Sequence, residues 1–395
     1  MTEPQHVPLG DLVSVTRGTT YKSALLNQPG PVLLGLASIA RNGGFRTDNL
    51  KTYGGECPEK LLVRPGDLFA SLKDVTQSAQ LLGSVARLPL NAPVGRLTQD
   101  TVRLDVVSDG VDPAYLYLSL LTPEYRQYCR GHATGTTNLG LPREDFLAYT
   151  VLLPPLSEQR RIAGVLGALD DLIDTNRRLA VDISLVQLAR FKLTWGGATR
   201  SRLNEVATIT MGQSPPGKSY NEDGDGTPFY QGTRDFGWRY PSRRVWTTQP
   251  TRLAHVRDVL VAVRAPVGEL NLASETTALG RGVAGLRASG RQGTLFQALQ
   301  ADPRLWDIHQ GTGTVFAAIN KADMAALAVP WVDDGALEES LSEMDAAIAN
   351  LEREVVDLTR ARDELLPLLV SGRVRVEDVA VWPGAAVPIP GYGGD

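Results

Sequence analysis

Cysteine and histidine are scarce in this chain, and each shortage narrows what the protein can be. Its 395 residues include two cysteines, Cys57 and Cys129, far apart and outside any C-x-x-C pattern, and four scattered histidines. This usage argues against a disulfide-stapled secreted domain and leads us to expect a reducing, cytoplasmic environment. It also predicts no metal site built from thiolates or imidazoles.

Long apolar runs and familiar hydrolytic signatures are missing as well. No stretch approaches the roughly 18 apolar residues of a membrane span. The opening sequence MTEPQHVPLG lacks the basic and then apolar order of a signal peptide. Neither H-E-x-x-H nor G-x-S-x-G occurs. We therefore expect a protein that neither crosses a membrane nor carries one of these hydrolytic centres.

Charge of both signs is present but unevenly distributed. The formal net charge of −4 taken alone argues against a nucleic-acid partner. Residues 230–264, however, contain seven arginines against two acids, and residues 333–364 contain eleven acids against three arginines. One region is therefore cationic and aromatic, and another is strongly anionic, so charge must be judged segment by segment.

An internal repeat organises the chain. Four blocks recur in the same order, roughly 175–195 residues apart, which indicates a duplicated unit. We interpret each unit as a mixed α/β globule followed by a long helix. The paired blocks are LGDLVSVTRG (9–18) with LNEVATITMG (203–212), RPGDLFAS (64–71) with VRDVLVAV (256–263), GTTNLGLPREDFLAYTVLLP (135–154) with GTVFAAINKADMAALAVPWV (313–332), and LGALDDLIDTNRRL (166–179) with LSEMDAAIANLERE (341–354).

Each globule carries strand-like runs between loops rich in glycine and proline. β-branched and apolar residues in these runs favour strands, and the flanking glycines and prolines favour turns. The sequence DPAYLYLSLLTPEYRQYC in the first globule predicts a helix with an apolar face. The expected strands are Val32–Leu36, Val102–Val107, Val259–Val263 and Val283–Leu286.

Two long helices are the clearest structural prediction. The first follows Pro154-Pro155, with Ser157 as its N-cap and Glu158 in its first turn. Apolar residues then recur at spacings of three and four in both helices, as in the seam of a coiled coil. The predicted seam is Ile162, Val165, Leu169, Leu172, Asn176, Leu179, Ile183 and Val186 in the first helix, and Leu337, Leu341, Met344, Ile348, Leu351, Val355, Leu358 and Leu365 in the second.

Asn176 interrupts the seam of the first helix. A buried asparagine at one seam position fixes the register of a coiled coil at some cost in stability. Because one fold-length of chain separates the two helices, we expect them to pair antiparallel. The alternative is that each is a separate surface helix packed on its own globule.

One short stretch has the pattern of a nucleotide-binding loop. Gly212, Gly217, Lys218 and Ser219 match G-x-x-x-x-G-K-[ST], the P-loop that cradles phosphates between a strand and a helix. The following YNEDGDGTP contains two glycines, a proline and three acids, so no helix is expected there. We therefore reject a P-loop and expect two polar loops of shared duty, carrying Lys22 and Lys218; two ordinary surface turns remain the alternative.

A second apparent motif is DPAY at residues 112–115. It is close to the D-P-P-Y element with which adenine methyltransferases hold a flipped base, but the second proline is missing. No F-x-G-x-G cofactor loop lies upstream. Asp112 and Pro113 instead predict the cap and first turn of a helix.

A family resemblance emerges from these blocks. PPLSEQRRIAGVLGALDDLID (154–174) resembles the helical region of the specificity (S) subunit of type I restriction–modification enzymes, where P-P-L-x-E-Q-x-x-I opens a long spacer helix. The stretches MGQSPPGKSYN, TPFYQGTRDFG, VRAPVGELNLA, ALGRGVAGL and GTVFAAINKADM are similar to a target-recognition domain of that family. The second helix lacks the P-P-L-x-E-Q signature, and the first globule matches more loosely.

The resemblance implies a non-catalytic subunit that recognises a bipartite, asymmetric DNA sequence. Each globule would contact one half-site in the major groove of double-stranded DNA, and an antiparallel pair of spacer helices would set the gap. Two modification (methyltransferase) subunits would dock on the chain, bringing S-adenosylmethionine and flipping the target adenine. Restriction subunits driven by ATP and Mg²⁺ would join for cleavage. No cofactor is expected in this chain.

The expected fold is therefore mixed α/β, with two target-recognition globules joined by two long antiparallel coiled-coil helices. Such a chain places two different DNA-recognition globules on one rigid spacer, so the length of the spacer sets the distance between the half-sites. The expected boundaries are 1–155 for the first globule, 156–196 for the first helix, 197–331 for the second globule, 332–371 for the second helix and 372–395 for a flexible tail.

Candidate DNA-binding residues are chosen by loop position and chemistry. Arginine and glutamine can contact bases through two hydrogen bonds, whereas lysine, serine and threonine more often contact phosphate. We expect Phe236, Trp238 and Trp246 to lie in the core, because duplex readers seldom need stacking platforms. The candidates are Thr20, Lys22, Arg41, Lys73, Thr136 and Thr137 in the first globule, and Ser214, Lys218, Gln231, Arg234, Arg264, Arg281 and Thr314 in the second.

Other functions remain open at this point. The chain could serve a related system in which methylation and cleavage share one polypeptide partner. It could be an ATPase that uses the loop at 212–219, or a coiled-coil adaptor that binds no DNA.

Overall fold

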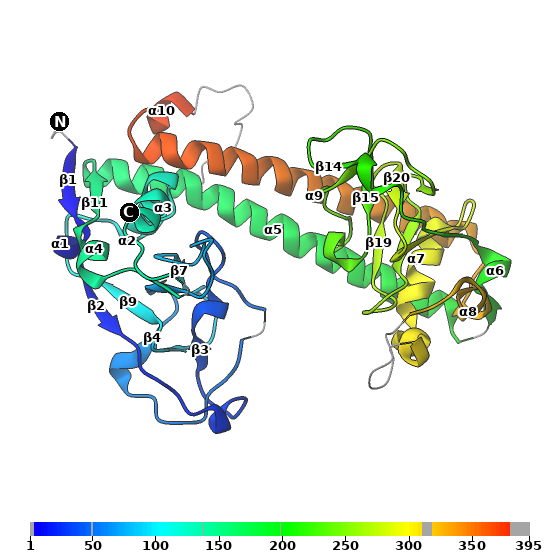
Figure 1. The fold of residues 1–395 in the computed structure, drawn as a ribbon, viewed down its shortest axis with the longest axis horizontal. Coiled ribbons are helices and arrows are strands. Elements are labelled where there is room, and N and C mark those ends of the chain that lie inside the picture. The colour runs from blue at the N-terminus through cyan, green and yellow to red at the C-terminus, as the bar shows by residue number, and fades with distance from the viewer. Residues whose placement is uncertain (1–3, 49, 137, 198, 310–317, 380–395) are drawn as a thin grey trace, which may run out of the picture. The chain divides into compact units, whose positions relative to one another are not determined.

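The computed structural model describes residues 4–48, 50–136, 138–197, 199–309 and 318–379. The chain divides into two compact units. Unit 1 comprises residues 1–173 and 356–395, and unit 2 comprises residues 174–355. None of the helices in the described ranges has the length and apolarity of a membrane span. Each unit combines sheets with helices (Figure 1), so the expected mixed α/β fold is confirmed.

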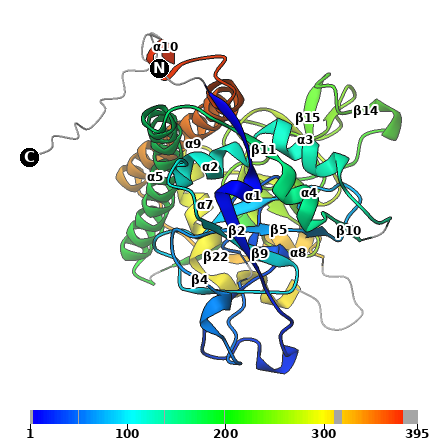
Figure 2. The same ribbon diagram turned by 90° about the vertical axis from the view of Figure 1, so that its left-hand side faces the viewer.

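Unit 1 is built on an antiparallel four-stranded sheet of order β2-β9-β5-β7. A three-stranded sheet of order β3-β8-β4 and the two-stranded pairs β1-β11 and β10-β6 complete its strands. Figure 2 shows α2 and α4 beside the main sheet. The strands are β1 (Gln5–Pro8), β2 (Val13–Arg17), β3 (Val32–Leu34), β4 (Leu62–Val63), β5 (Leu68–Ser71), β6 (Lys73–Asp74), β7 (Val85–Arg87), β8 (Gly95–Leu97), β9 (Thr101–Val106), β10 (Leu139–Gly140) and β11 (Thr150–Leu153).

Short helices close the first sheet. Asp112 caps α2 by accepting hydrogen bonds from the N–H groups of Ala114 (3.0 Å) and Tyr115 (3.1 Å), which confirms the capping role predicted for DPAY. Thr122 caps α3 in the same way. The unit contains α1 (Leu9–Leu12), α2 (Pro113–Ser119), α3 (Pro123–Gly131), α4 (Arg143–Ala148) and α10 (Val376–Val379), with 3-10 turns η1 (Ser23–Leu25), η2 (Leu36–Ser38) and η3 (Glu59–Leu61).

Unit 2 repeats this topology. Its antiparallel sheet has the order β13-β21-β18-β19, and the pair β12-β22 corresponds to β1-β11. In β15-β20-β17 the first pairing is parallel and the second antiparallel, as in β3-β8-β4. The strands are β12 (Arg200–Arg202), β13 (Thr208–Met211), β14 (Tyr220–Asn221), β15 (Thr227–Tyr230), β16 (Trp246–Thr247), β17 (Leu253–Ala254), β18 (Val259–Ala262), β19 (Leu270–Leu272), β20 (Thr277–Leu279), β21 (Val283–Arg287) and β22 (Ala328–Pro330).

The four strands expected from the sequence all form, as β3, β9, β18 and β21. The sheet β14-β16-β15-β20-β17 of unit 2 has two strands, β14 and β16, that its counterpart β3-β8-β4 in unit 1 lacks. The helices and turns of unit 2 outside the long helices are α6 (Leu203–Val206), α7 (Gln292–Ala301), α8 (Lys321–Ala326), η4 (Gly217–Ser219), η5 (Thr233–Asp235) and η6 (Pro303–His309). The duplication seen in the sequence is therefore a duplication of fold.

Two long helices contribute to both units: α5 (Leu156–Trp195) and α9 (Gly335–Val370). α5 begins at Leu156, so Ser157 lies in its first turn and the predicted N-cap is wrong. The prolines at 154 and 155 set this start, because proline tolerates the first helical turn but not the interior. Glu158 lies in the first turn, as predicted.

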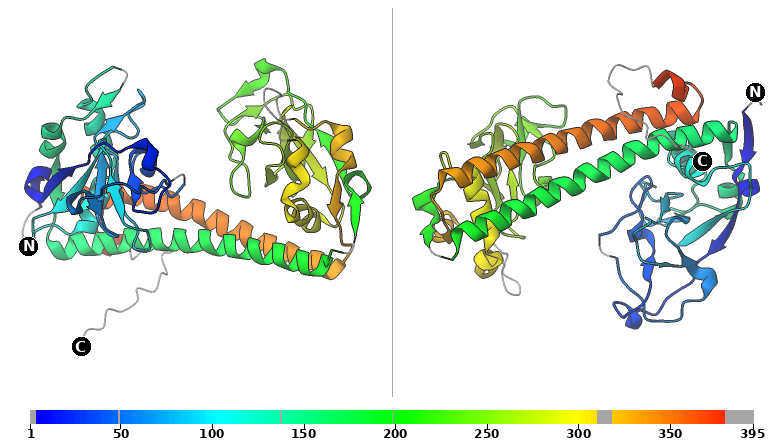
Figure 3. Two further views of the ribbon diagram at one scale, coloured as in Figure 1. Left: turned by 90° about the horizontal axis from the view of Figure 1, so that it is seen from below. Right: turned by 180° about the vertical axis from the view of Figure 1, so that it is seen from behind.

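In each unit a segment of α5 packs beside a segment of α9 (Figure 3). In unit 1, Ile162 and Leu166 share a core with Leu366 and Leu369, and Arg362 binds Asp170 at 2.8 Å. In unit 2, the Gln187 amide donates to the Leu341 carbonyl at 3.0 Å. Phe191, Leu337 and Leu341 belong to the core of the second globule.

The seam predicted for α5 is partly wrong. Leu179 and Val186 are 46% and 56% exposed, whereas Ala180 and Gln187 are fully buried. The buried positions advance by three, four or seven residues, and a small residue and a polar residue fill two of them. A prediction based on apolar residues alone therefore misplaced the buried stripe. Ile162 and Asn176 are buried, and Val165, Leu169, Leu172 and Ile183 are half-buried. In α9 the predicted residues Leu337, Leu341, Ile348 and Val355 are buried and Met344, Leu351, Leu358 and Leu365 half-buried.

The missing signature at the start of α9 has a structural substitute. Gln159 is the fourth residue of α5, and its Oε1 accepts the Asp112 N–H at the start of α2 (2.9 Å). Glu338 is the fourth residue of α9, and its carboxylate accepts the N–H groups of Gly293 (2.9 Å) and Thr294 (2.8 Å) at the start of α7. A carboxylate suits a helix N-terminus electrostatically. Glu338 therefore takes the place of the glutamine.

The chain beyond α9 is packed further than we expected. Val374 and Val376 lie against the core of unit 1, and Val376 is the first residue of α10. The packed part thus extends into residues 372–395, which the sequence led us to expect as a flexible tail.

Candidate nucleic-acid interface

In the first globule, three chain segments meet where the main sheet ends. The Leu72 N–H, just after β5, donates to the Asp100 carbonyl (3.3 Å), and the Gly18 N–H, just after β2, donates to the Thr101 carbonyl (3.0 Å). Lys73 then forms an ion pair with Asp100, Nζ to Oδ1 at 3.0 Å. The candidate residue Lys73 is therefore held at this edge by the register of the sheet.

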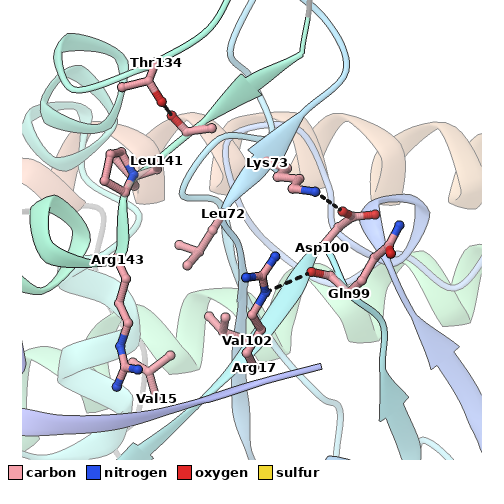
Figure 4. A pocket seen from close by; sticks show the side chains of 12 residues that line it. Val15, Arg17, Leu72, Lys73, Gln99, Asp100, Val102, Thr134, Leu141 and Arg143 are labelled. Atoms are coloured by element: carbon pink, nitrogen blue, oxygen red, sulfur yellow. Dashed lines mark hydrogen bonds and ion pairs between the residues drawn. The ribbon is translucent and has the colours of Figure 1, made fainter. Parts of the chain in front are cut away.

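A pocket of about 410 Å³ opens beside Lys73. Figure 4 shows Lys73 directed toward Asp100, Arg17 toward Gln99, and Arg143 on the opposite wall. The Arg17 Nε donates to the Gln99 carbonyl at 3.4 Å. Three cations and one carboxylate around apolar walls make the pocket suited to an anionic ligand. Its lining residues are Val15, Arg17, Leu72, Lys73, Gln99, Asp100, Val102, Thr134, Gly140, Leu141, Pro142 and Arg143.

The other first-globule candidates lie on different loops. Thr136 reaches the Lys73 region, because β6 pairs with β10 and the Gln77 amide donates to the Thr136 carbonyl (3.1 Å). Thr20 and Lys22 are exposed on the loop after β2, whose carbonyl at Thr20 accepts from the buried Arg96 (3.2 Å). Arg41 is exposed on a separate turn. Thr137 lies outside the described residues.

In the second globule the structure brings four candidates together. The Arg281 Nε lies 3.4 Å from the Ser214 hydroxyl. A Cβ on Gly282 would stand 2.1 Å from the Gln231 carbonyl oxygen, so the loops carrying Gln231 and Arg281 touch. The Val263 N–H donates to the Gly282 carbonyl (2.9 Å), which places Arg264 beside them. Ser214, Gln231, Arg264 and Arg281 thus form one polar edge.

A buried acid orders the loop that carries Gln231 and Arg234. The Asp235 carboxylate accepts the Gln231 N–H (2.8 Å) and pairs with Arg244 (2.7 Å). Arg234 is exposed on the same turn. Burial raises the pKa of Tyr230, which precedes this loop, to about 12, so its hydroxyl stays protonated. Thr314 lies outside the described residues.

The expectation that Trp238 lies in the core is wrong. Its side chain is 49% exposed, whereas Phe236 and Trp246 are half-buried. The neighbouring Arg239 occupies the interior instead, because acidic and amide groups are there to receive it.

The structure also argues against a P-loop at residues 212–219. β13 precedes Gly212, but the chain then forms the 3-10 turn η4 and strand β14, so no helix follows the pattern. Ser219 is buried, and its hydroxyl bonds to the Pro216 carbonyl and the Thr247 hydroxyl, both at 2.7 Å. Lys218 is exposed and stays a candidate for DNA contact.

Substitution of two glycines of that pattern by alanine is expected to change the stability of the protein by different amounts. A Cβ on Gly212 would stand 2.2 Å from the Gly280 carbonyl, whereas a Cβ on Gly217 meets nothing within 4 Å. Gly212→Ala should lower the free energy of unfolding by about 1–3 kcal/mol through overpacking, and Gly217→Ala should change it by less than about 0.5 kcal/mol. Urea unfolding of the two variants checks this; equal losses would contradict it.

The two polar edges are equivalent in backbone position. The hydrogen bond between Val263 and Gly282 is equivalent to the one between Leu72 and Asp100. The Gly212 N–H donates to the Val283 carbonyl (3.0 Å), just as the Gly18 N–H donates to the Thr101 carbonyl. Lys73 therefore corresponds to Arg264, and Gln99 to Arg281. The sequence repeat predicted the duplication but not which candidates share a position.

Comparison with known proteins finds one family to which parts of the chain are similar. Residues 89–184 match the family described as type I restriction modification DNA specificity domain. Over 253 residues the chain is 31% identical to a putative type I restriction enzyme MjaX specificity subunit of Methanocaldococcus jannaschii. Over these segments the chain is similar to specificity subunits of type I restriction enzymes. The match to that family member covers 57% of this chain and 59% of the relative's length.

One solved structure of such a subunit shares the fold of this chain. The S subunit of a type I restriction–modification system from M. genitalium is 16% identical, with a TM-score of 0.56, and the match covers 93% of this chain and 96% of that one. The HsdS subunit of Thermoanaerobacter tengcongensis is 24% identical over 94% of this chain and 97% of that one, with a TM-score of 0.35.

Sequence reasoning missed three cations at these edges, Arg17, Arg143 and Lys321. A usable signal was present, because the repeat blocks GTTNLGLPREDF and GTVFAAINKADM align Arg143 with Lys321. Each is the first residue of a short helix, α4 or α8.

Proposed function

We propose that this chain is the DNA-recognition subunit of a type I restriction–modification complex, and that it has no catalytic activity of its own. The duplicated polar edge is the observation that carries the proposal. Each globule presents cationic and amide side chains from converging loops, which is the chemistry of major-groove recognition. Two globules with different side chains at equivalent positions suit two different half-sites.

The antiparallel contacts between α5 and α9 inside each unit support a coiled-coil spacer. In this proposal the helices, 156–196 and 332–371, fix the gap between half-sites contacted by the globules at 1–155 and 197–331. Helices of this length are unusual in a globular domain. Because a rigid spacer fixes the distance between the two globules, the DNA site must have a fixed number of base pairs between its half-sites.

Partners supply the chemistry in this proposal. Two modification subunits would bind S-adenosylmethionine and methylate a flipped adenine, and restriction subunits would supply ATP-driven cleavage. The eleven acids of residues 333–364 suit a basic protein partner or solvent better than DNA.

Mapping adenine methylation in cells tests the proposal. Cells carrying this chain with its neighbouring methyltransferase gene are expected to methylate one bipartite motif with a fixed gap. The motif should vanish when this chain alone is deleted. Unchanged methylation after deletion, with the methyltransferase expressed, would overturn the partnership.

A further inference from the structure

Arg143 stands apart from the other cations of the first-globule pocket. Lys73 is paired with Asp100 and Arg17 is bonded to the Gln99 carbonyl. Among the described residues the Arg143 guanidinium has no hydrogen bond or ion pair, and the side chain is exposed. Its charge is therefore not neutralised within the described residues. It lines a pocket whose other charged residues, Arg17, Lys73 and Asp100, already give a net positive charge.

Lys321 holds the same backbone position in the second globule. The Leu141 N–H donates to the Leu72 carbonyl (2.9 Å), and the Ile319 N–H donates to the Val263 carbonyl (3.0 Å). Arg143 and Lys321 each follow two residues later, as the first residues of α4 and α8. Lys321 is likewise exposed, and its ammonium has no hydrogen bond or ion pair within the described ranges.

The two edges differ elsewhere. Gln99 corresponds to Arg281, and Asp100 corresponds to Gly282. The amide and the acid of the first edge are thus replaced by a cation and a glycine in the second. Groups that contact bases should differ between two readers of an asymmetric site, whereas groups that contact the uniform phosphate backbone need not. Positive charge is kept at two positions, Lys73 with Arg264 and Arg143 with Lys321.

We propose that Arg143 and Lys321 bind DNA phosphates, one in each globule, beside Lys73 and Arg264. This inference rests on the proposed DNA-recognition function and adds to it two residues that hold each globule on the backbone. Phosphate contacts set the position of a protein on the duplex without selecting sequence. Arg143→Ala and Lys321→Ala should therefore weaken binding to every duplex alike.

The test is a salt titration of duplex binding by the full chain in complex with its methyltransferase partner. Fluorescence anisotropy would follow the motif duplex and a scrambled duplex between 50 and 200 mM KCl, concentrations over which phosphate contacts lose affinity steeply. Each alanine variant should lower the slope of log K against log salt by about 0.9 on both duplexes. Lys321→Arg should keep the wild-type slope.

Matched controls are two cations that lie away from the polar edges. Arg87 pairs with Leu68 at the start of β5, and Arg202 ends β12, before α6 and β13. Arg87→Ala and Arg202→Ala should leave the slope unchanged. Arg143 and Lys321 variants that behave like these controls would overturn the inference.

Two other outcomes would also overturn it. A loss confined to the motif duplex would make these residues base readers. Saturable binding of AMP that Arg143→Ala abolishes, with duplex binding intact, would make the pocket a nucleotide site. A wild-type complex that retained neither duplex would instead contradict the proposed function, which separates the two failures.

Discussion

Asp345→Ala is expected to lower the free energy of unfolding by about 3–5 kcal/mol, because it leaves a buried arginine without its counter-ion. The Arg239 guanidinium is 2% exposed and contacts the Asp345 carboxylate and the Gln187 Oε1 (3.1 Å). Its carbon lies 4.1 Å from the centre of the Phe296 ring. Gln187 also donates to Asp345 at 2.8 Å, so one network inside unit 2 joins a globule loop to α5 and α9.

Chemical unfolding of the variants measures this effect. Asp357→Ala is the matched control on α9, since its pair with Arg360 is exposed on both sides and should contribute at most about 0.5 kcal/mol. Replacing both buried ions, as in Arg239→Leu with Asp345→Leu, should recover much of the lost stability. A loss in Asp345→Ala no larger than in the control would show that the buried pair is not a stabilising contact.

Arg281→Ala combined with Gln231→Ala is expected to remove discrimination at one half-site. Bidentate contacts from arginine or glutamine to a base are each worth about 1–3 kcal/mol, so the double variant should lose about 2–6 kcal/mol on the motif duplex. Ser214 and Arg264 lie at the same edge and would remain to contact that half-site. Competition binding with duplexes altered in one half-site at a time measures the loss.

The position of the loss is as informative as its size. Substitutions in one half of the motif should become tolerated, while substitutions in the other half should cost the same as in the wild type. Arg202→Ala is the control from the same globule. A loss spread equally over both half-sites would contradict the assignment of one globule to one half-site.

Local features of the fold were predictable because they are written in short-range patterns. β-branched runs predicted β3, β9, β18 and β21, and Asp112-Pro113 predicted the cap of α2. Three-and-four spacing predicted both long helices, yet it placed Leu179 and Val186 in a seam where Ala180 and Gln187 are buried. Burial of a glutamine depends on a partner, here Asp345, that lies 158 residues away.

The sequence by itself determined the duplication, the mixed α/β class, the two helices and the absence of a P-loop. Only the tertiary structure decided which side chains share an edge. Ser214, Gln231, Arg264 and Arg281 come from four separate loops and meet because strand register places those loops together. The same register makes Arg143 the counterpart of Lys321. The physical reason is that periodicity and capping act within a few residues, whereas a binding surface is assembled by hydrogen bonds between strands far apart in the chain.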